Sequence, residues 1–246
     1  MKYYKCDPYK IEFALLDNTN LTFDNHNHIS IYAIGLILDG NVILTKKNVV
    51  YEFTTDDLFI IPPYMVHSLI PSSGQYSIIT LCIGTEFLDT HDFNTGKLLI
   101  RDLANQLVYD GFLTHPQVKA FLDALELVYD MAIKLDADYA TIITEAKNLI
   151  ETQPEEDITL DALSQQVFVS KYYLIREFKK AIGLSPHRFQ IQNRIRKAQH
   201  LLTNGSTMTE TAQSTGFYDQ SHFIKYFKKI VGITPSEYLA SLKILD

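Results

Sequence analysis

The spacing of apolar positions changes from one part of the chain to the next. Between residues 11 and 83, short apolar runs rich in β-branched and aromatic residues alternate with turn-forming residues, which predicts strands rather than helices. Asp39, Gly40 and Asn41 lie between two of these runs and predict a tight hairpin turn, since such residues supply positive φ angles. The pattern predicts a small β-barrel or sandwich, with strands at residues 11–16, 29–38, 42–45, 49–53, 58–61 and 76–83.

Helical spacing follows farther along the chain. From residue 116 to residue 135, apolar residues recur every three or four positions, and a second such segment begins at about residue 139, after Asp136 and Asp138. Stripes of this kind are typical of amphipathic helices, which commonly pack on their own domain. The two stripes consist of Val118, Phe121, Leu122, Leu125, Val128, Ala132 and Leu135, and of Ile142, Ile143, Ala146 and Ile150.

Two stretches near the C-terminus form an internal repeat. Residues 170–189 and 219–238 align without a gap at an offset of 49 positions, and glycine, proline and aromatic residues stay in register. Each copy is therefore expected to form the same supersecondary unit. The identical pairs are Ile175/Ile224, Phe178/Phe227, Lys179/Lys228, Lys180/Lys229, Gly183/Gly232 and Pro186/Pro235.

Each copy carries the signals of a helix with defined ends. Ser170 and Asp219 can accept hydrogen bonds from the first backbone N–H groups, and Gly183 and Gly232 tolerate the positive φ that follows the last turn. A Ser-Pro or Thr-Pro pair then starts the next helix, with proline at its first position. A short helix precedes each copy, because Thr159 provides an N-cap before the first and a Thr-x-x-Glu capping box stands before the second. The sequence therefore predicts two helix-turn-helix units.

One face of each second helix is polar and basic. Leu174 and Phe178 lie on the opposite face of the first copy, and Phe223 and Phe227 on that of the second. Arginine and lysine suit phosphates and guanine edges, glutamine, serine and histidine supply further donors and acceptors, and isoleucine can touch a thymine methyl. The residues expected to bind DNA are Lys171, Tyr172, Ile175, Arg176 and Lys179 in the first copy, and Gln220, Ser221, His222, Lys225 and Lys228 in the second.

Residues 158–241 resemble the DNA-binding domain of the AraC/XylS family of bacterial transcription regulators, most clearly over residues 215–238. The resemblance implies two helix-turn-helix units held apart by one long helix, here residues 186–202. A helix of that length spans about 25 Å, so its ends can set two reading helices into successive major-groove segments about 34 Å apart. Its inward-facing residues are expected to be Phe189, Ile195, Ala198 and Leu202.

Three positions depart from the family pattern. Ser164 and Thr211 stand in the short first helices, where the family usually has apolar or small residues, and we expect slightly looser packing there. Phe168 occupies the turn position that carries Gly216 in the second unit. The reading faces are intact, and the resemblance implies base contacts by Tyr172, Ile175 and Arg176 and by Gln220, Ser221, His222 and Lys225.

The N-terminal segment resembles a cupin, the sugar-sensor type of barrel often fused to AraC-type DNA-binding domains. His26, His28 and His67 stand where cupin motifs place metal-binding histidines, but a glutamate ligand is missing near Tyr32 and Tyr64 replaces a customary glycine. Three imidazoles can still hold a divalent metal with open positions. Alternatively, they line an effector pocket of the size that such a barrel encloses. No cofactor is required, and the expected effector-binding residues are His26, His28, Tyr32 and His67.

The sequence predicts an α+β protein in two domains. Residues 1–150 are expected to form a cupin-like β-barrel with flanking helices for effector binding and dimerisation, and residues 151–157 a polar linker. Residues 158–246 are expected to form an all-α domain of two helix-turn-helix units joined by a long helix. The net charge is −7, yet 12 Lys/Arg and 9 Asp/Glu give residues 155–246 a charge of +3, while residues 1–154 carry −10. DNA phosphates therefore attract the C-terminal part and repel the N-terminal part.

The expected location is the bacterial cytoplasm, in association with the nucleoid. The sequence has no apolar run of about eighteen residues, and its first ten residues lack the apolar stretch of a signal peptide. Cys6 and Cys82 do not form a metal-type pair, and a disulfide is not expected in the cytosol. We expect no membrane partner.

These features favour a ligand-responsive transcription regulator, an activator by family habit and not an enzyme. Its expected partners are promoter DNA, a small-molecule effector, RNA polymerase and a second copy of the chain, since the family implies a dimer contact through helices within residues 116–150. The alternatives are a metal-dependent cupin enzyme or metal sensor with an appended DNA-binding domain, and an architectural protein that compacts DNA. The missing carboxylate argues against the enzyme, and the negative net charge argues against the architectural protein.

Overall fold

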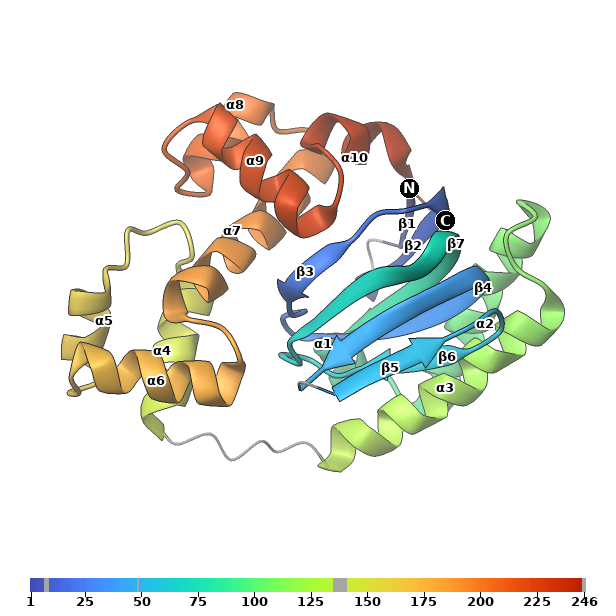
Figure 1. Cartoon of the computed structure of the whole chain (residues 1–246), viewed down its shortest axis with the longest axis horizontal. Coiled ribbons are helices and arrows are strands. Elements are labelled where there is room, and N and C mark those ends of the chain that lie inside the picture. The colour runs from blue at the N-terminus through green and yellow to red at the C-terminus, as the bar shows by residue number, and fades with distance from the viewer. Residues whose placement is uncertain (7–8, 48, 135–140, 245–246) are drawn as a thin grey trace. The chain divides into compact units, whose positions relative to one another are not determined.

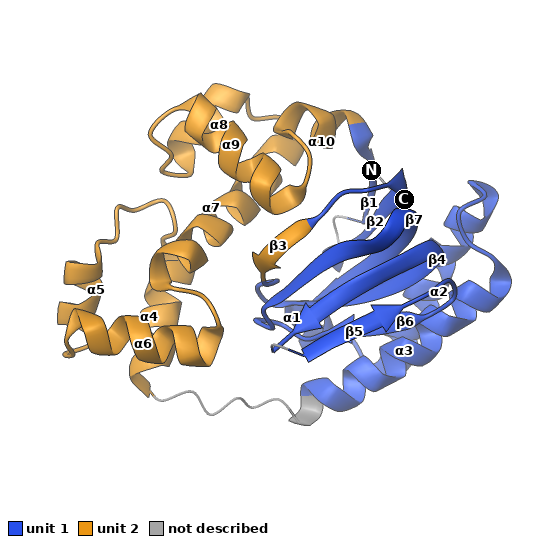
Figure 2. Cartoon of the chain, in the orientation of Figure 1, with its two compact units in different colours: residues 1–22, 27–136, 241–246 blue, residues 23–26, 137–240 orange. Residues whose placement is uncertain are grey.

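The computed structural model describes the chain except residues 7–8, 48, 135–140 and 245–246 (Figure 1). The chain divides into two compact units (Figure 2). Residues 1–22, 27–136 and 241–246 make up the first unit, and residues 23–26 and 137–240 make up the second. This division follows the contacts within the fold and falls at residue 136, ahead of the linker that the sequence predicts at residues 151–157.

The strands of the first unit form one mixed sheet. Their order is β5-β4-β7-β2-β1-β8, with β6 also paired to β4. The strand β1 pairs with β2 in antiparallel and with the C-terminal strand β8 in parallel. The strands predicted at residues 49–53 and 58–61 are confirmed. The bounds are β1 Lys2–Cys6, β2 Ile11–Thr19, β3 Phe23–His26, β4 Ile31–Lys46, β5 Val49–Phe53, β6 Leu58–Ile61, β7 His67–Gly84 and β8 Leu242–Ile244.

The hairpin predicted at residues 39–41 is wrong, because β4 continues through these residues as one strand. Its pairing with β7 shifts register between residues 37 and 42, which marks a β-bulge. Gly40 has a φ of +78°, and a Cβ there would lie 2.5 Å from the carbonyl oxygen of Gln75. The glycine thus supplies positive φ to a bulge, and the local sequence does not distinguish this use from a turn.

Gly40→Ala is expected to destabilise the sheet. A side chain at such a φ costs about 1–3 kcal/mol, and the close approach of the Gln75 carbonyl adds to that cost. Gly74→Ala is the matched control, since Gly74 has a φ of +68° but nothing lies within 4 Å of its Cβ position. In thermal unfolding we expect both variants to melt earlier, with the larger loss for Gly40→Ala. Equal losses would mean that the contact with Gln75 contributes nothing.

The helices of the first unit pack on the core that the sheet provides. They are α1 (Thr85–Thr90), α2 (Phe93–Tyr109) and α3 (His115–Lys134). The predicted stripe on α3 is buried in this core, where the ring centroids of Phe121 and Phe13 lie 6.0 Å apart. The stripe therefore packs on its own domain, although Leu135 lies outside the described residues. The helix α2 is absent from the sequence-based prediction, although its buried residues recur at helical spacing as Ile100, Leu103, Ala104 and Leu107.

The second unit contains both predicted helix-turn-helix units. The helix α4 (Thr141–Thr152), which the sequence assigns to the N-terminal domain, lies here against α6 and α7. No helix in the described part of the chain is long and apolar enough to cross a membrane. The first helix-turn-helix unit is α5 (Leu160–Gln166) and α6 (Lys171–Ile182), the second is α8 (Met208–Ser214) and α9 (Gln220–Val231), α7 (Pro186–Thr203) joins them, and α10 (Pro235–Ser241) follows.

The predicted helix ends are confirmed. The side chains of Ser170 and Asp219 each accept a hydrogen bond from the backbone N–H three residues on, and so cap α6 and α9. Gly183 and Gly232 end these helices in the left-handed region, with φ of +82° and +92°. Thr207 and Glu210 form the predicted capping box of α8. Both units therefore owe their boundaries to the same local chemistry.

Candidate nucleic-acid interface

The two reading helices, α6 and α9, each bury one face and expose the other. Aromatic packing fixes them on their neighbours: the ring centroids of Phe178 and Phe189 lie 5.4 Å apart, and those of Phe227 and Tyr238 lie 5.5 Å apart. These contacts hold α6 on α7 and α9 on α10, so the polar faces stay outward. The buried residues are Leu174, Phe178 and Ile182 on α6, and Phe223, Phe227 and Val231 on α9.

Two cations of α6, Lys171 and Arg176, are exposed, and each is paired with one carboxylate. The Arg176 side chain is 70% exposed, and its Nε donates to the Glu177 carboxylate over 2.9 Å. Lys171 forms an ion pair with Asp161 of α5. Exposed pairs of this kind contribute about 0–1 kcal/mol, so both cations can exchange a carboxylate for a phosphate or a base edge. Of the other residues predicted on this face, Tyr172 and Lys179 are exposed and Ile175 is half-buried.

On α9 one predicted contact is turned partly inward. The half-buried His222 ring lies 4.8 Å from the Tyr226 ring and 5.7 Å from the Phe217 ring, measured between centroids. Its Nδ1 is buried without a hydrogen-bond partner among the described residues. Gln220 is exposed and accepts a hydrogen bond from the Thr209 hydroxyl at 3.2 Å. The other residues predicted on this face, Ser221, Lys225 and Lys228, are exposed.

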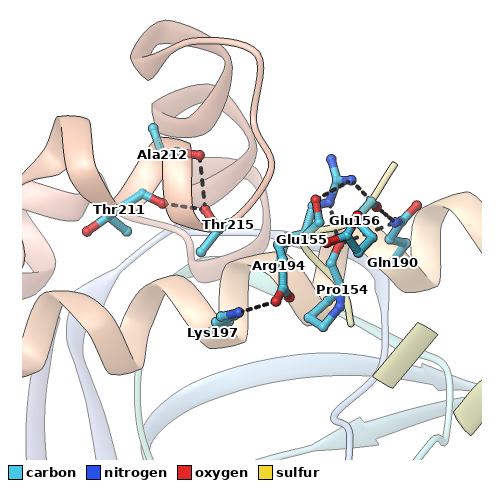
Figure 3. A network of polar contacts seen from close by, with 9 residues as sticks. All are labelled: Pro154, Glu155, Glu156, Gln190, Arg194, Lys197, Thr211, Ala212 and Thr215. Carbon is cyan, nitrogen blue, oxygen red and sulfur yellow. Dashed lines mark hydrogen bonds and ion pairs between the residues drawn. The ribbon is translucent and has the colours of Figure 1, made fainter. Parts of the chain in front are cut away.

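The two polar residues that depart from the family pattern are both buried. The Ser164 hydroxyl donates to the Asp161 carbonyl at 3.0 Å. Thr211 is fully buried, and its carbonyl accepts the Thr215 hydroxyl at 2.6 Å (Figure 3). The Thr211 hydroxyl itself has no hydrogen-bond partner among the described residues. An unsatisfied buried hydroxyl is unfavourable, so α8 carries a small destabilising feature that α5 does not share.

Arg194 of α7 ties the segment before α5 to the turn of the second helix-turn-helix unit. Figure 3 shows its contacts with that segment. It is 8% exposed, and its guanidinium donates to the carbonyls of Pro154 at 2.7 Å, Glu156 at 2.8 Å and Gly216 at 2.6 Å. Gln190, one turn earlier, also donates to the Glu156 carbonyl, at 2.7 Å. Burial lowers the Arg194 pKa from its ordinary value, and nearby carboxylates oppose that effect. We refer to Arg194, Gln190 and the carbonyls they bind as the linker clamp.

The close approach of the segment before α5 explains why residue 216 is a glycine. Gly216 in the second turn has a φ of +74°, and a Cβ there would lie 2.1 Å from the Glu155 carbonyl oxygen. The Glu155 carboxylate pairs with Lys197 at 2.7 Å, and this hydrogen bond lowers the Glu155 pKa. Sequence reasoning misses the clamp. Its available signal is a pair of polar residues, Gln190 and Arg194, four positions apart on a helix that also carries the apolar stripe of Phe189, Ile195, Ala198 and Leu202.

Of the three histidines predicted for an effector or a metal, two lie at strand ends and His28 lies in the loop between β3 and β4. His67 begins β7 and is 3% exposed, and its ring centroid lies 5.0 Å from that of His28. His26 ends β3 and belongs to the second unit, whereas His28 and His67 belong to the first. The Nδ1 atoms of His26 and His67 lie 2.8 and 2.9 Å from the carbonyl oxygens of Asp24 and Met65. Because a carbonyl only accepts, each Nδ1 carries a proton in this arrangement.

The remaining predicted effector residue, Tyr32, has a different setting. It is 2% exposed in the hydrophobic core of the first unit, and burial raises its pKa. Tyr64, which replaces a customary glycine, has a φ of +62°, and its backbone N–H donates to the His28 carbonyl at 2.7 Å. In the second unit, a cavity of about 260 Å³ is lined by His26 together with Arg188 and other residues of α7 and α9. Of the four predicted residues, His26 is thus the one that lines this cavity.

Comparisons with known proteins match both parts of the chain. Residues 9–126 match the family described as AraC-like ligand binding domain, and residues 163–241 match the family described as helix-turn-helix domain. An uncharacterised HTH-type transcriptional regulator of Haemophilus influenzae is 31% identical over 256 residues, which cover 85% of this chain and 86% of that protein. The HTH-type transcriptional activator Btr of Bacillus subtilis is 32% identical over 165 residues, which cover 63% of this chain and 31% of that protein.

A solved structure gives the same architecture. ToxT from Vibrio cholerae aligns with a TM-score of 0.64 over 99% of this chain and 100% of its own, at 15% sequence identity. That identity shows a shared fold and no more. The ligand-binding match runs from β2 into α3, and the helix-turn-helix match runs from α5 to α10. These two family matches, together with a relative that is 31% identical over 85% of this chain, show that the chain belongs to the AraC/XylS family of transcription regulators.

Proposed function

We propose that α6 and α9 read two neighbouring major-groove segments of one promoter site. The observation that carries the proposal is that both helices expose a polar and basic face while the linker clamp and α7 hold them in one unit. The 18 residues of α7 span about 27 Å, which approaches the 34 Å of one helical turn of DNA. A single chain then offers two reading helices to one face of the duplex.

Different residues are proposed to fix position and to read sequence. Arg176 is suited to a bidentate contact with guanine, and Gln220 to one with adenine. Tyr172, Ile175, Ser221, His222 and Lys225 complete the proposed set that faces bases. Lysine acts as a point charge that suits phosphate, and this role is proposed for Lys171, Lys179 and Lys228.

Lys179→Ala and Lys228→Ala are expected to weaken binding to every DNA sequence alike. Each removes one phosphate contact, so the slope of log affinity against log salt should fall by about 1 per substitution. Electrophoretic mobility shifts at several salt concentrations, on a selected operator and on random DNA, measure this slope. A change in sequence preference without a change in slope would assign these lysines to bases instead.

An effector is proposed to act through the N-terminal domain. A ligand shifts the equilibrium between two arrangements only by its difference in affinity for them. His26, His28, His67 and Tyr32 are the proposed contact residues, and a second copy and RNA polymerase complete the proposed assembly, with activation as its result. Sedimentation velocity tests the proposed dimer through residues 116–150. Transcription by RNA polymerase from a selected promoter, compared with and without this protein, tests the sign of regulation.

A divalent metal is a second candidate ligand for the same domain. The support is that the His28 and His67 rings of the first unit lie 5.0 Å apart between centroids, and that the Nδ1 proton of His67 is directed at a backbone carbonyl, as metal-binding histidines commonly do. Zinc or nickel would be expected to bind near one equivalent per chain and to be lost in His67→Ala. His115→Ala, at an exposed histidine on α3, is the control. Metal content equal in both variants and in the parent, measured by mass spectrometry after dialysis, would exclude the histidines as ligands.

A further inference from the structure

Phe168, in the turn of the first helix-turn-helix unit, combines two unfavourable features. Its φ is +55°, in the left-handed region that L-residues with a bulky side chain rarely adopt. Its side chain is also 94% exposed, so the ring contributes nothing to the core. An outlier that the fold does not use for packing points toward a functional role.

The second unit shows what the turn itself requires. The turns of the two units contain equivalent backbone hydrogen bonds. In the first unit the Val169 N–H donates to the Ser164 carbonyl at 3.0 Å, and in the second the Phe217 N–H donates to the Ala212 carbonyl at 3.0 Å. The residue before this donor is Phe168 in the first unit and Gly216 in the second, and both have positive φ. Glycine therefore satisfies the turn. The phenylalanine ring is an addition that the turn does not need.

The position of Phe168 places its ring beside the reading helix. It stands two residues before Ser170, the N-cap of α6. In a helix-turn-helix the N-terminal residues of the second helix contact base edges, so the turn immediately before them approaches the duplex as well. Tyr172 in the first turn of α6 is 88% exposed, and Tyr218, directly before the N-cap of α9, is 93% exposed. Each reading helix thus begins next to exposed aromatic side chains.

We infer that Phe168 is a DNA-contacting residue of the first helix-turn-helix unit. An exposed aromatic ring can make apolar contact with a thymine methyl group, which is accessible in the major groove, or with a deoxyribose. The first contact selects thymine, and the second favours DNA of any sequence. The inference rests on the proposed reading of DNA by α6 and extends the site to a residue in the turn before that helix.

Phe168→Gly separates the ring from the turn. Glycine adopts the observed φ without strain, so the variant should unfold at the same temperature as the parent or higher. Its affinity for a selected operator should nevertheless fall about fivefold, the effect of losing one apolar contact. Phe168→Asn, which also tolerates this backbone, should behave in the same way. Tyr109→Ala is the control, because Tyr109 is 92% exposed at the end of α2, and it should leave DNA binding unchanged.

Substituting deoxyuridine for each thymine of the operator distinguishes the two DNA contacts. If the ring touches a methyl group, one deoxyuridine substitution weakens operator binding by the parent protein but not by Phe168→Gly. If the ring touches deoxyribose, no deoxyuridine substitution has this selective effect, and Phe168→Gly still binds the operator about fivefold more weakly than the parent. Unchanged operator affinity in Phe168→Gly overturns the inference, and a simultaneous loss of transcription would then assign the ring to a protein partner. A lower melting temperature that accounts for the loss of binding also overturns it. Failure of the proposed function is recognised separately, because Arg176→Ala would then leave binding unchanged too.

Discussion

Replacing Arg194 by methionine is expected to abolish specific DNA binding although the residue faces the interior. The substitution keeps the apolar stem and removes a guanidinium that donates to the carbonyls of Pro154, Glu156 and Gly216. Hydrogen bonds to a charged group are worth about 1.5–3 kcal/mol each, and buried carbonyls left without donors add a further penalty. We expect a loss of about 3–5 kcal/mol in the second unit.

The loss of binding follows from what the linker clamp joins. Gly216 belongs to the second helix-turn-helix turn, and the carbonyls of residues 154–156 belong to the segment that leads into α5. Without Arg194 the two reading helices lose a shared support, so contacts at both half-sites are no longer made together. Thermal unfolding followed by circular dichroism, combined with a mobility shift on a selected operator, measures both effects.

Two variants make this expectation specific. Arg194→Lys keeps the charge but cannot reach three carbonyls at once, so it should restore little of the stability. Arg101→Met is the matched control, since the Arg101 side chain is 48% exposed on α2 and paired only with the exposed carboxylate of Asp102 among the contacts described for it. It should change stability by no more than about 0.5 kcal/mol. An Arg194→Met protein that melts with the parent and binds DNA would show that the clamp is dispensable.

Arg176→Ala is expected to weaken specific binding by about 1–3 kcal/mol, which is about 5-fold to 150-fold in affinity. The proposed bidentate contact to guanine is lost, whereas binding to random DNA changes little. In selection from a random library, the variant should accept any base at one position that the parent restricts to guanine. Its fold should be unaffected, because the side chain is 70% exposed and its pair with Glu177 is solvated.

Arg176→Lys tests the geometry of the contact rather than the charge. Lysine retains the attraction to phosphate but lacks the planar fork, so affinity for random DNA should persist while discrimination at the guanine position falls. Lys180→Ala, on the same helix and also exposed, serves as the control for simple loss of a positive charge. Equal site preference in the parent, Arg176→Ala and Arg176→Lys would remove this residue from the reading face.

The helix-turn-helix units were predictable because their signals are local. Ser170, Gly183 and the capping box at Thr207 each fix a helix end through contacts within four residues, and the internal repeat doubles every such signal. The exposed reading faces follow from the apolar positions on the opposite side. His222 is the exception, since its ring packs toward Tyr226 and Phe217, and no spacing rule shows which rotamer a half-exposed histidine adopts.

Other features depend on residues far apart in sequence and were not predictable in the same way. The bulge at Gly40 is decided by the backbone of β7 near Gln75, and the parallel pairing of β1 with β8 joins the first strand of the chain to its last. The linker clamp likewise depends on carbonyls about 40 positions from Arg194. Backbone carbonyls are present at every residue, so sequence alone does not reveal which of them a buried arginine will bind.

Base-resolved footprinting of the purified chain on its selected operator tests the central claim most directly. Two reading helices in one unit predict two groups of contacted bases about 10 base pairs apart on one face of the duplex. Arg176→Ala should erase contacts in one group and Gln220→Ala contacts in the other. A single contacted segment, or two variants that erase the same bases, would contradict the claim that one chain reads two major-groove segments.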